Sequence, residues 1–309
     1  MSSNAFRSFV IVNPASAAGA TGRRWVRIAK LLRSSLGEFE HAATQEPGEA
    51  TMLSRAALRE GFEMIVSVGG DGTLNEVVGG FFDGSATVAP EAVLGVVALG
   101  TGCDFGRTIG QSDLESACAR LAGRKTRSID VGIARFTGHD GVPARRVFIN
   151  VASFGCGARV AHLVSPRLKA VSGQLAFTLA TLRALAVYRD QVVTLEFDDL
   201  PPRSLAITNC AFGNGRFFGA GMQVAPAAQL DDGELDVTIW SGFRLMDFIR
   251  KRHMLYDGSH VREPGAQVLR CRRAIATSES TVLLELDGES AGRLPVQLEL
   301  LAGAVKLKV

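Results

Sequence analysis

The first 128 residues alternate short apolar runs with segments whose apolar residues recur every three or four positions. "SFVIVNP" is an apolar run that stops at Asn-Pro, so it predicts a buried strand entering a loop. Residues 22–37 predict a helix that ends at Gly37, because their apolar residues share one helical face: Trp25, Ile28, Ala29, Leu31 and Leu32. The same alternation predicts further strands at 39–44, 63–70 and 93–102 and further helices at 48–61, 71–82 and 113–123. Strands that alternate with helices indicate a parallel sheet covered by helices.

The pattern changes near residue 128. Most of the remaining segments alternate like strands, among them "SIDVGIARF", "QVVTLEFDD", "ELDVTIW" and "PVQLELL", and only about two helices are expected, near 160–188 and 243–256. We therefore predict an α/β domain over residues 1–128 and a β-rich domain over residues 129–309, with the extreme C-terminus packing back on the first domain.

Composition limits the function classes. Of 309 residues, 47% are apolar and 21% charged, and the net charge of +3 is far below that of a dedicated nucleic-acid binder. Five scattered cysteines form no CxxC pair, which argues against a zinc site or a disulfide framework and suits a reducing cytoplasm. With no signal peptide and no apolar stretch long enough to span a bilayer, we expect a cytoplasmic protein.

Three glycine- or proline-marked turns follow predicted strands: "NPASAAG", "GGDGT" and "LGTGCD". In a parallel sheet such turns meet at one edge, where ligands bind. Gly69, Gly70 and Gly72 would let the backbone approach an anion and adopt positive φ, and the following helix would aim its N–H groups at phosphate. Asp71 would then face a cation or a hydroxyl. The alternative is a set of tight turns in which Asp71 caps its own helix. Neither a P-loop nor a GxGxxG fingerprint is present.

Two acidic turns mark the second half. "QLDDGELD" surrounds Gly233 with carboxylates, which suits Mg²⁺ or Ca²⁺, but from the residues alone an Asp-Gly turn before a strand is the favoured interpretation. In "LELDGES", Asp287 and Glu289 stand two residues apart, so on a strand both carboxylates would share one face; the alternative is a hairpin turn with solvated acids. The basic segment 250–264 fits a solvated helix end better than a membrane-binding surface.

"GGDGTLNEVVGG" closely resembles the signature of the diacylglycerol kinase catalytic domain family, which includes sphingosine, ceramide and bacterial lipid kinases. "VIVNP", "ALGTGCDFGRTIG", "FINVASFGCGARV", "GNGRFFGAGMQVAPAAQLDDGELDV" and "ELDGE" resemble the family's other motifs in the same order, so the resemblance covers nearly the whole chain.

The resemblance implies a three-layer αβα domain, similar to those of phosphofructokinases and NAD kinases, followed by a β-sandwich-like domain. It also implies an ATP- and Mg²⁺-dependent lipid kinase that phosphorylates diacylglycerol at the membrane surface, with peripheral membrane contact, no nucleic acid and, in some relatives, a homodimer. The nucleotide-binding residues implied are Asn13, Pro14, Thr44, Gly69, Gly70, Asp71, Gly72, Thr73, Leu74, Asn75, Thr101 and Asp104.

In the second domain the resemblance implies that Glu289 is the general base and Asp287 its partner, with Asp71 completing the catalytic set. It implies a structural Mg²⁺ site at Gln229, Asp232 and Glu234, and it places Asp130 in a Mg²⁺–water network.

The chain departs from the family pattern at Ala98, Cys103 and Gly106, where Pro, Asn and Ala are common, and in its longer first loop. The alternatives are a kinase of another lipid, such as a sphingoid base or phosphatidylglycerol, a kinase of a small soluble acceptor such as NAD, or a catalytically silent lipid-binding protein.

Overall fold

The computed structural model describes residues 6–100, 102–163 and 173–309, without the side chains of 173–179. The chain forms two compact units, unit 1 (1–129 and 303–309) and unit 2 (130–302). None of the described helices is long and apolar enough to cross a bilayer.

Unit 1 is a parallel sheet with helices on both faces. Its strands run in the order β2-β1-β3-β6, and residues 306–307 of β17 add a last parallel strand beside β6. The elements are β1 (Ser8–Val12), α1 (Ala20–Arg23), α2 (Trp25–Leu36), β2 (Glu40–Ala43), α3 (Glu49–Arg59), β3 (Met64–Gly69), α4 (Asp71–Gly80), β4 (Phe82–Asp83), β5 (Ala86–Thr87), β6 (Val93–Ala98), α5 (Asp104–Thr108) and α6 (Leu114–Ala122). The predicted strands and helices are present, and only the short α1, α5, β4 and β5 were not expected.

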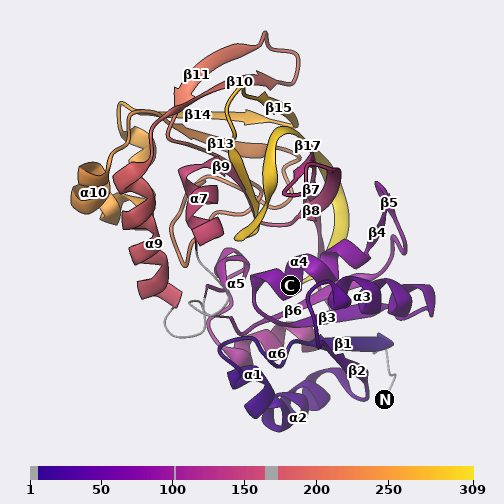
Figure 1. Ribbon diagram of the computed structural model, residues 1–309. Coiled ribbons are helices and arrows are strands. Elements are labelled where there is room, and N and C mark those ends of the chain that lie inside the picture. The colour runs from indigo at the N-terminus through magenta and orange to yellow at the C-terminus, as the bar shows by residue number, and fades with distance from the viewer. Residues whose placement is uncertain (1–5, 101, 164–172) are drawn as a thin grey trace. The chain divides into compact units, whose positions relative to one another are not determined.

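Three layers follow from where the apolar residues lie. Helices α2 and α6 pack together, and Ile28, Leu32 and Leu121 join the sheet residues Val66 and Val97 in one core. Helices α3 and α4 pack together on the opposite face (Figure 1). The αβα fold predicted for the first domain is confirmed.

Unit 2 is a β-sandwich with helices at its margin. Its strands are β7 (Thr126–Gly138), β8 (Pro143–Phe148), β9 (Val151–Gly155), β10 (Gln191–Phe197), β11 (Arg203–Ile207), β12 (Asn209–Gly213), β13 (Leu235–Trp240), β14 (Ala266–Cys271), β15 (Arg273–Thr277), β16 (Leu283–Leu286) and β17 (Glu289–Lys308), the last ending in unit 1. Its helices are α7 (Cys156–Leu163), α9 (Gly173–Val187), α10 (Leu245–Asp257) and the 3₁₀ turn η1 (Ser259–Arg262).

One sheet of the sandwich runs β14-β13-β12-β9-β16, and β10, β11 and β15 belong to the other. Strand β17 joins the two, because its first residues pair with β16 and residues 296–299 pair with β15. The core between the sheets is rich in aromatic and branched residues, including Phe154, Phe197 and Phe212. The β-sandwich-like second domain is therefore also confirmed.

Candidate active site

The predicted nucleotide loops of unit 1 lie at one edge of its sheet. Strands β1, β2, β3 and β6 are parallel, so their carboxyl ends point the same way. Asn13 and Pro14 follow β1, Thr44 follows β2, the Gly69–Gly70 pair ends β3, and Ala98 ends β6. The backbone continues this pairing, because the Thr44 N–H donates to the Val12 carbonyl and the Asn13 N–H to the Val68 carbonyl, both at 2.9 Å.

The first two loops are tied together by side chains. The Asn13 Nδ2 donates to the Thr73 hydroxyl at 3.0 Å, while its Oδ1 accepts the Ala15 N–H at 3.0 Å. Thr73 is buried, so this hydroxyl is held in place from the neighbouring loop. The loop after Pro14 is also closely packed, since the Pro14 carbonyl accepts the Gly22 N–H at 3.1 Å.

The glycines of the second loop allow the loops to approach one another. A Cβ on Gly69 would lie 2.7 Å from the Thr73 hydroxyl, and a Cβ on Gly100 would lie 2.7 Å from the Gly70 Cα. Gly69, Gly70 and Gly72 are absent from the residues with positive φ, and Gly70 is extended at φ −91°. The prediction of positive φ at these glycines was wrong. A side chain is instead excluded at Gly69 by the Thr73 side chain and at Gly100 by the Gly70 backbone.

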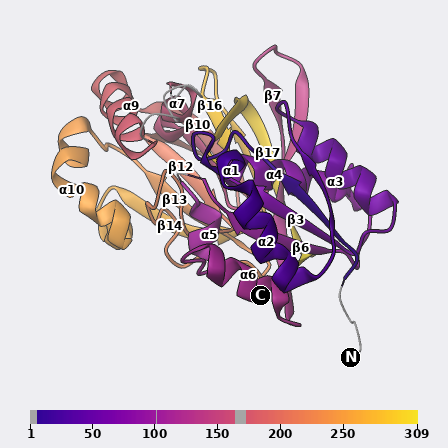
Figure 2. The same cartoon turned by 90° about the horizontal axis from the view of Figure 1, so that it is seen from below.

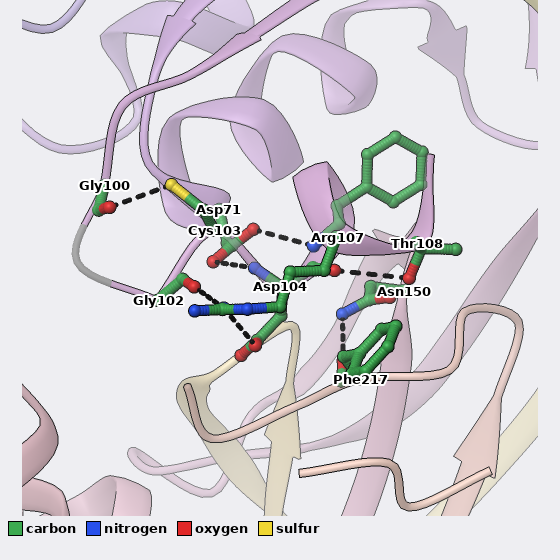
Figure 3. Close-up of polar contacts among 10 residues, drawn as sticks. Asp71, Gly100, Gly102, Cys103, Asp104, Arg107, Thr108, Asn150 and Phe217 are labelled. Carbon is green, nitrogen blue, oxygen red and sulfur yellow. Dashed lines mark hydrogen bonds and ion pairs between the residues drawn. The ribbon is translucent and has the colours of Figure 1, made fainter. Parts of the chain in front are cut away.

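Asp71 bonds to the third loop. Its Oδ2 accepts the Asp104 N–H at 3.1 Å and its Oδ1 accepts the Phe105 N–H at 3.2 Å, so the carboxylate caps the start of α5 (Figure 3). The alternative that Asp71 caps its own helix is wrong, because Gly70 occupies the N-cap of α4. Burial raises the pKa of the Asp71 carboxyl, while the two N–H donors and the charge of Arg107 lower it in part.

The rest of the third loop is held by a short network. Asp104 is buried and pairs with Arg107 at 3.1 Å, and Arg107 also donates to the Gly102 carbonyl. Thr101, the remaining predicted residue of this loop, lies outside the described residues.

The start of α4 presents backbone donors at the same edge. The first helical bond runs from the Leu74 N–H to the Gly70 carbonyl, so the preceding N–H groups of the helix have no carbonyl within it. Leu74 and Asn75 point inward and are buried. Of the predicted residues here, Thr73 and the backbone of residues 71–73 are the groups best placed for an anion.

In unit 2, Asp287 occupies a hairpin turn rather than a strand. Asp287 and Gly288 have φ of 49° and 85° and connect β16 to β17, with Leu286 paired to Glu289. Two left-handed residues in a two-residue turn are typical of a type I′ hairpin. The prediction that Asp287 and Glu289 share one face of a strand was wrong, since they belong to a turn and to the strand after it.

The acid in this turn is not solvated either, although Gly288 is exposed. Asp287 is buried, and its oxygens accept the N–H groups of Ile149, Asn150 and Val151, each at 2.9 Å. The neighbouring Glu285 is buried as well and accepts the Ser153 hydroxyl at 2.5 Å. Buried carboxylates therefore fix the hairpin that carries Glu289.

Glu289 is more accessible. Its side chain is 39% exposed, and its Oε2 accepts a hydrogen bond from Arg146 at 2.9 Å. Ser290 contacts His139 and His162 at 3.0 and 3.2 Å, and the two rings lie 5.5 Å apart. Sequence reasoning missed Arg146 and this histidine pair, because more than 120 residues separate them from Glu289 and Ser290 and no local spacing links them.

The predicted structural metal site contains an arginine. Arg270 donates to Asp232, and its guanidinium lies 2.9 Å from Glu234 and 3.5 Å from Asp236. Asp130 is buried, and its Oδ2 accepts the Gly233 N–H at 2.8 Å. Gln229 precedes this turn in the chain, and among the described residues no group of three His, Cys, Asp or Glu ligands is arranged for a metal. As arranged, these carboxylates fit a guanidinium rather than a divalent cation, and the metal role of Gln229, Asp232, Glu234 and Asp130 stays a prediction.

Comparison with known proteins identifies the fold and the family. A model of the diacylglycerol kinase catalytic domain matches residues 7–134, and a model of the YegS C-terminal NAD kinase beta sandwich-like domain matches residues 150–309. The diacylglycerol kinase of Bacillus subtilis (strain 168) is 30% identical over 94% of this chain and 91% of its own length. The chain belongs to the diacylglycerol kinase family.

One more relative supports this family, and a solved structure shares the fold. The "Probable lipid kinase YegS-like" of Chromohalobacter salexigens is 31% identical over 85% of this chain and 81% of its own length. The crystal structure of a diacylglycerol kinase from Bacillus anthracis str. Sterne has a TM-score of 0.73 at 20% identity, covering 99% of this chain and 98% of the other, which shows a shared fold. Members of this family are phosphotransferases with an alcohol acceptor, and this chain is a kinase.

The residues that depart from the family pattern, Ala98, Cys103 and Gly106, make contacts with residues near them in the chain. Ala98 has an N–H, which proline lacks, and Gln111 accepts it at 3.1 Å and donates back to the Ala98 carbonyl at 2.8 Å. A Cβ on Gly106 would lie 2.8 Å from the Ala98 Cβ. Cys103 has φ 49° and its thiol donates to the Gly100 carbonyl at 2.8 Å, while burial raises the pKa of that thiol to about 12. The described residues of the third loop are thus held by hydrogen bonds and packing within unit 1.

Proposed function

We propose that this kinase transfers the γ-phosphoryl group of ATP to a lipid hydroxyl, with diacylglycerol as the acceptor and phosphatidic acid as the product. The observation that carries the proposal is the linkage of three loops at one sheet edge, Asn13 to Thr73 and Asp71 to the start of α5. Phosphoryl transfer needs positioning and charge stabilisation more than covalent chemistry, and a preorganised platform provides both.

Within this proposal the first turn of α4 donates to the phosphates, because its N–H groups and the helix dipole favour an anion. Thr73, fixed by Asn13, adds a hydroxyl. The remaining nucleotide contacts are those that the family resemblance implies: Asn13, Pro14, Thr44, Gly69, Gly70, Gly72, Leu74, Asn75, Thr101 and Asp104.

Mg²⁺, when bound with ATP, would neutralise phosphate charge, and we propose Asp71 to hold it. Each Asp71 oxygen accepts one backbone N–H, and a carboxylate has about four acceptor positions, so acceptor capacity remains. The half-buried position of Asp71 suits an oxygen ligand for a hard cation.

For the acceptor hydroxyl we propose Glu289 as the general base. Its carboxylate is accessible and is oriented by Arg146, whereas Asp287 is buried and accepts three backbone N–H groups. Asp287 then acts through the hairpin, as a positioning residue for Glu289.

The test is incubation of the pure protein with labelled ATP and, separately, diacylglycerol in detergent micelles, phosphatidylglycerol, a sphingoid base and NAD. Labelled phosphatidic acid, identified by mass spectrometry and dependent on Mg²⁺, is the expected product. Phosphorylation of NAD alone would instead assign a soluble acceptor, and a lack of turnover with every acceptor would overturn the kinase proposal.

A further inference from the structure

Helix α10 has two apolar faces, and one of them has no partner among the residues of unit 2 that the structure describes. Its inner face packs on a small core, in which Phe248 is buried and Leu245 and Leu255 are partly buried. Its outer face carries Met246 and Ile249, exposed at 52% and 51%, and Tyr256, exposed at 37%. The helix contacts α9, and it lies at the outer margin of unit 2 in both views (Figures 1 and 2).

The spacing of the outer residues makes a continuous stripe. Met246, Ile249, His253 and Tyr256 are separated by three, four and three positions, so they follow one another along one side of the helix. Exposed apolar residues are common singly, whereas Met246, Ile249 and Tyr256 lie on one side of the helix along three turns.

Arginines flank the stripe. At 100° per residue, Arg250 lies on one side of it and Arg252 on the other, and both are exposed. Neither has an ion pair with any described residue, whereas Lys251 of the same helix pairs with Glu263. The two acids of the helix lie near its ends, where Asp247 accepts the Arg244 N–H and Asp257 accepts the Ser259 N–H.

We propose that this face of α10, formed by Met246, Ile249, Arg250, Arg252 and Tyr256, docks the protein on an anionic membrane surface. Apolar side chains flanked by cations are what an interfacial helix needs, because the apolar stripe enters the acyl boundary while the guanidinium groups meet lipid phosphates. Each such cation strengthens binding to an anionic surface. A second copy of the chain fits less well, since a symmetric contact through the stripe would bring arginines together.

The proposal rests on a lipid acceptor, which requires the enzyme to reach a membrane. The membrane-docking proposal and the lipid-kinase proposal can fail separately. Diacylglycerol in detergent micelles tests the chemistry without a bilayer, and vesicles that lack diacylglycerol test docking without the chemistry.

The experiment is co-sedimentation with vesicles of phosphatidylcholine alone and of phosphatidylcholine and phosphatidylglycerol in equal parts. The wild type should bind the anionic vesicles and release them as salt is added. Ile249→Ser/Arg250→Gln should bind at least about tenfold more weakly, with roughly fivefold of this from the arginine, which corresponds to about 1 kcal/mol. Its activity on micellar diacylglycerol should equal that of the wild type.

The matched control is Val26→Ser/Lys30→Gln on α2, which also removes one exposed valine and one exposed cation, Val26 being 85% exposed. It should bind vesicles like the wild type. Equal binding by the α10 variant and the wild type, or no binding by the wild type to either vesicle, would overturn the proposal. A third result would also overturn the proposal: light scattering finds a dimer for the wild type and a monomer for the α10 variant, while vesicle binding is intact. Helix α10 would then be a contact between two copies of the chain.

Discussion

Asp71-Gly72 in unit 1 and Asp287-Gly288 in unit 2 are the same dipeptide in two backbone geometries. Asp71 opens helix α4, and Gly72 is not among the glycines with positive φ, whereas Asp287 and Gly288 are both left-handed in a hairpin. Yet both carboxylates accept N–H groups from a segment far away in sequence, Asp71 from the start of α5 and Asp287 from residues 149–151.

The two carboxylates differ in how many of their acceptor positions remain available for a ligand. Asp71 is half-buried and accepts two N–H groups, while Asp287 is only 6% exposed and accepts three. Asp287 has little capacity left for a ligand, because three of its roughly four acceptor positions are used and the side chain is buried. We therefore expect Asp71 to act in the reaction and Asp287 to stabilise the fold, and mutation of each residue tests these roles.

The largest effect should come from Asp71→Asn. We expect phosphoryl transfer to fall by about 10⁴-fold, the upper end of what one positioned carboxylate contributes, because the charge that would hold Mg²⁺ is lost. Stability should change by only about 1–2 kcal/mol, since Asn can still accept one of the two N–H groups. Steady-state kinetics and urea unfolding of the same preparation would check both.

The raised pKa of Asp71 adds a pH signature. At sub-saturating Mg²⁺ and ATP, wild-type activity should decline as pH falls through the raised pKa of Asp71, at a higher pH than for an ordinary carboxylate. The ionised form is disfavoured by burial, so its destabilising effect is present above the folded-state pKa and is relieved as pH falls. Undiminished turnover in a folded Asp71→Asn protein would remove Asp71 from the chemistry.

Glu289→Gln tests the accessible acid of the hairpin, Glu289, as the general base. We expect kcat to fall by about 10²–10⁴-fold with the KM for ATP nearly unchanged, because the residue would act on the acceptor. Stability should change by less than about 1 kcal/mol, since the Arg146 pair is partly exposed. Arg146→Gln is the control, expected to lower kcat less. A normal kcat with a raised KM for ATP would place Glu289 in nucleotide binding.

Asp287→Ala should instead act on folding. It leaves three N–H groups without their acceptor, and we expect a loss of about 3–5 kcal/mol in the free energy of unfolding of unit 2. Trp240, buried in unit 2, reports this transition by fluorescence in a Trp25→Phe background. Asp287→Asn, which keeps one oxygen, should lose less. A stable but inactive Asp287→Ala protein would move Asp287 into the catalytic set.

A third Asp-Gly pair, Asp232-Gly233, extends the comparison. Here the guanidinium of Arg270 already occupies the position beside the carboxylates. We expect the melting temperature of the wild type to be the same with Mg²⁺ and with EDTA, since Arg270 balances Asp232 and Glu234. Arg270→Gln should lower the stability of unit 2 by about 1–3 kcal/mol, and Mg²⁺ should restore part of it. A clear loss of wild-type stability in EDTA would instead support the metal site.

The sequence predicted most of this fold because its signals are local. Apolar runs ending in Gly or Pro marked β1, β3 and β6, and the helix stop at Gly37 appears as a left-handed glycine at φ 78°. Residues 145–155 belong to two strands, β8 and β9, rather than to one, because residues 149–151 turn their N–H groups to Asp287.

The candidate site was only partly predictable for the same reason. Spacing marked Asp71, Asp287 and Glu289 as acids of interest, but not their partners, since Asp104 and Val151 are distant in sequence from the acids that they contact. Arg270 could not have been assigned to Asp232 from any local pattern, because the contact arises from strand pairing between β13 and β14.

The smallest effect should come from Cys103→Asn, which places the residue common in the family beside Asp71. Cys103 has φ 49° and ψ 42°, and Asn adopts this left-handed conformation more readily than most residues. Its amide can also donate to the Gly100 carbonyl in place of the thiol. We therefore expect a gain of up to about 1 kcal/mol and a KM for ATP within about threefold of the wild type. Cys103→Val is the contrast, because a β-branched residue in this conformation costs about 1–3 kcal/mol. If Asn lowers activity severely while Val does not, the loop depends on the chemistry of the thiol rather than on its backbone conformation.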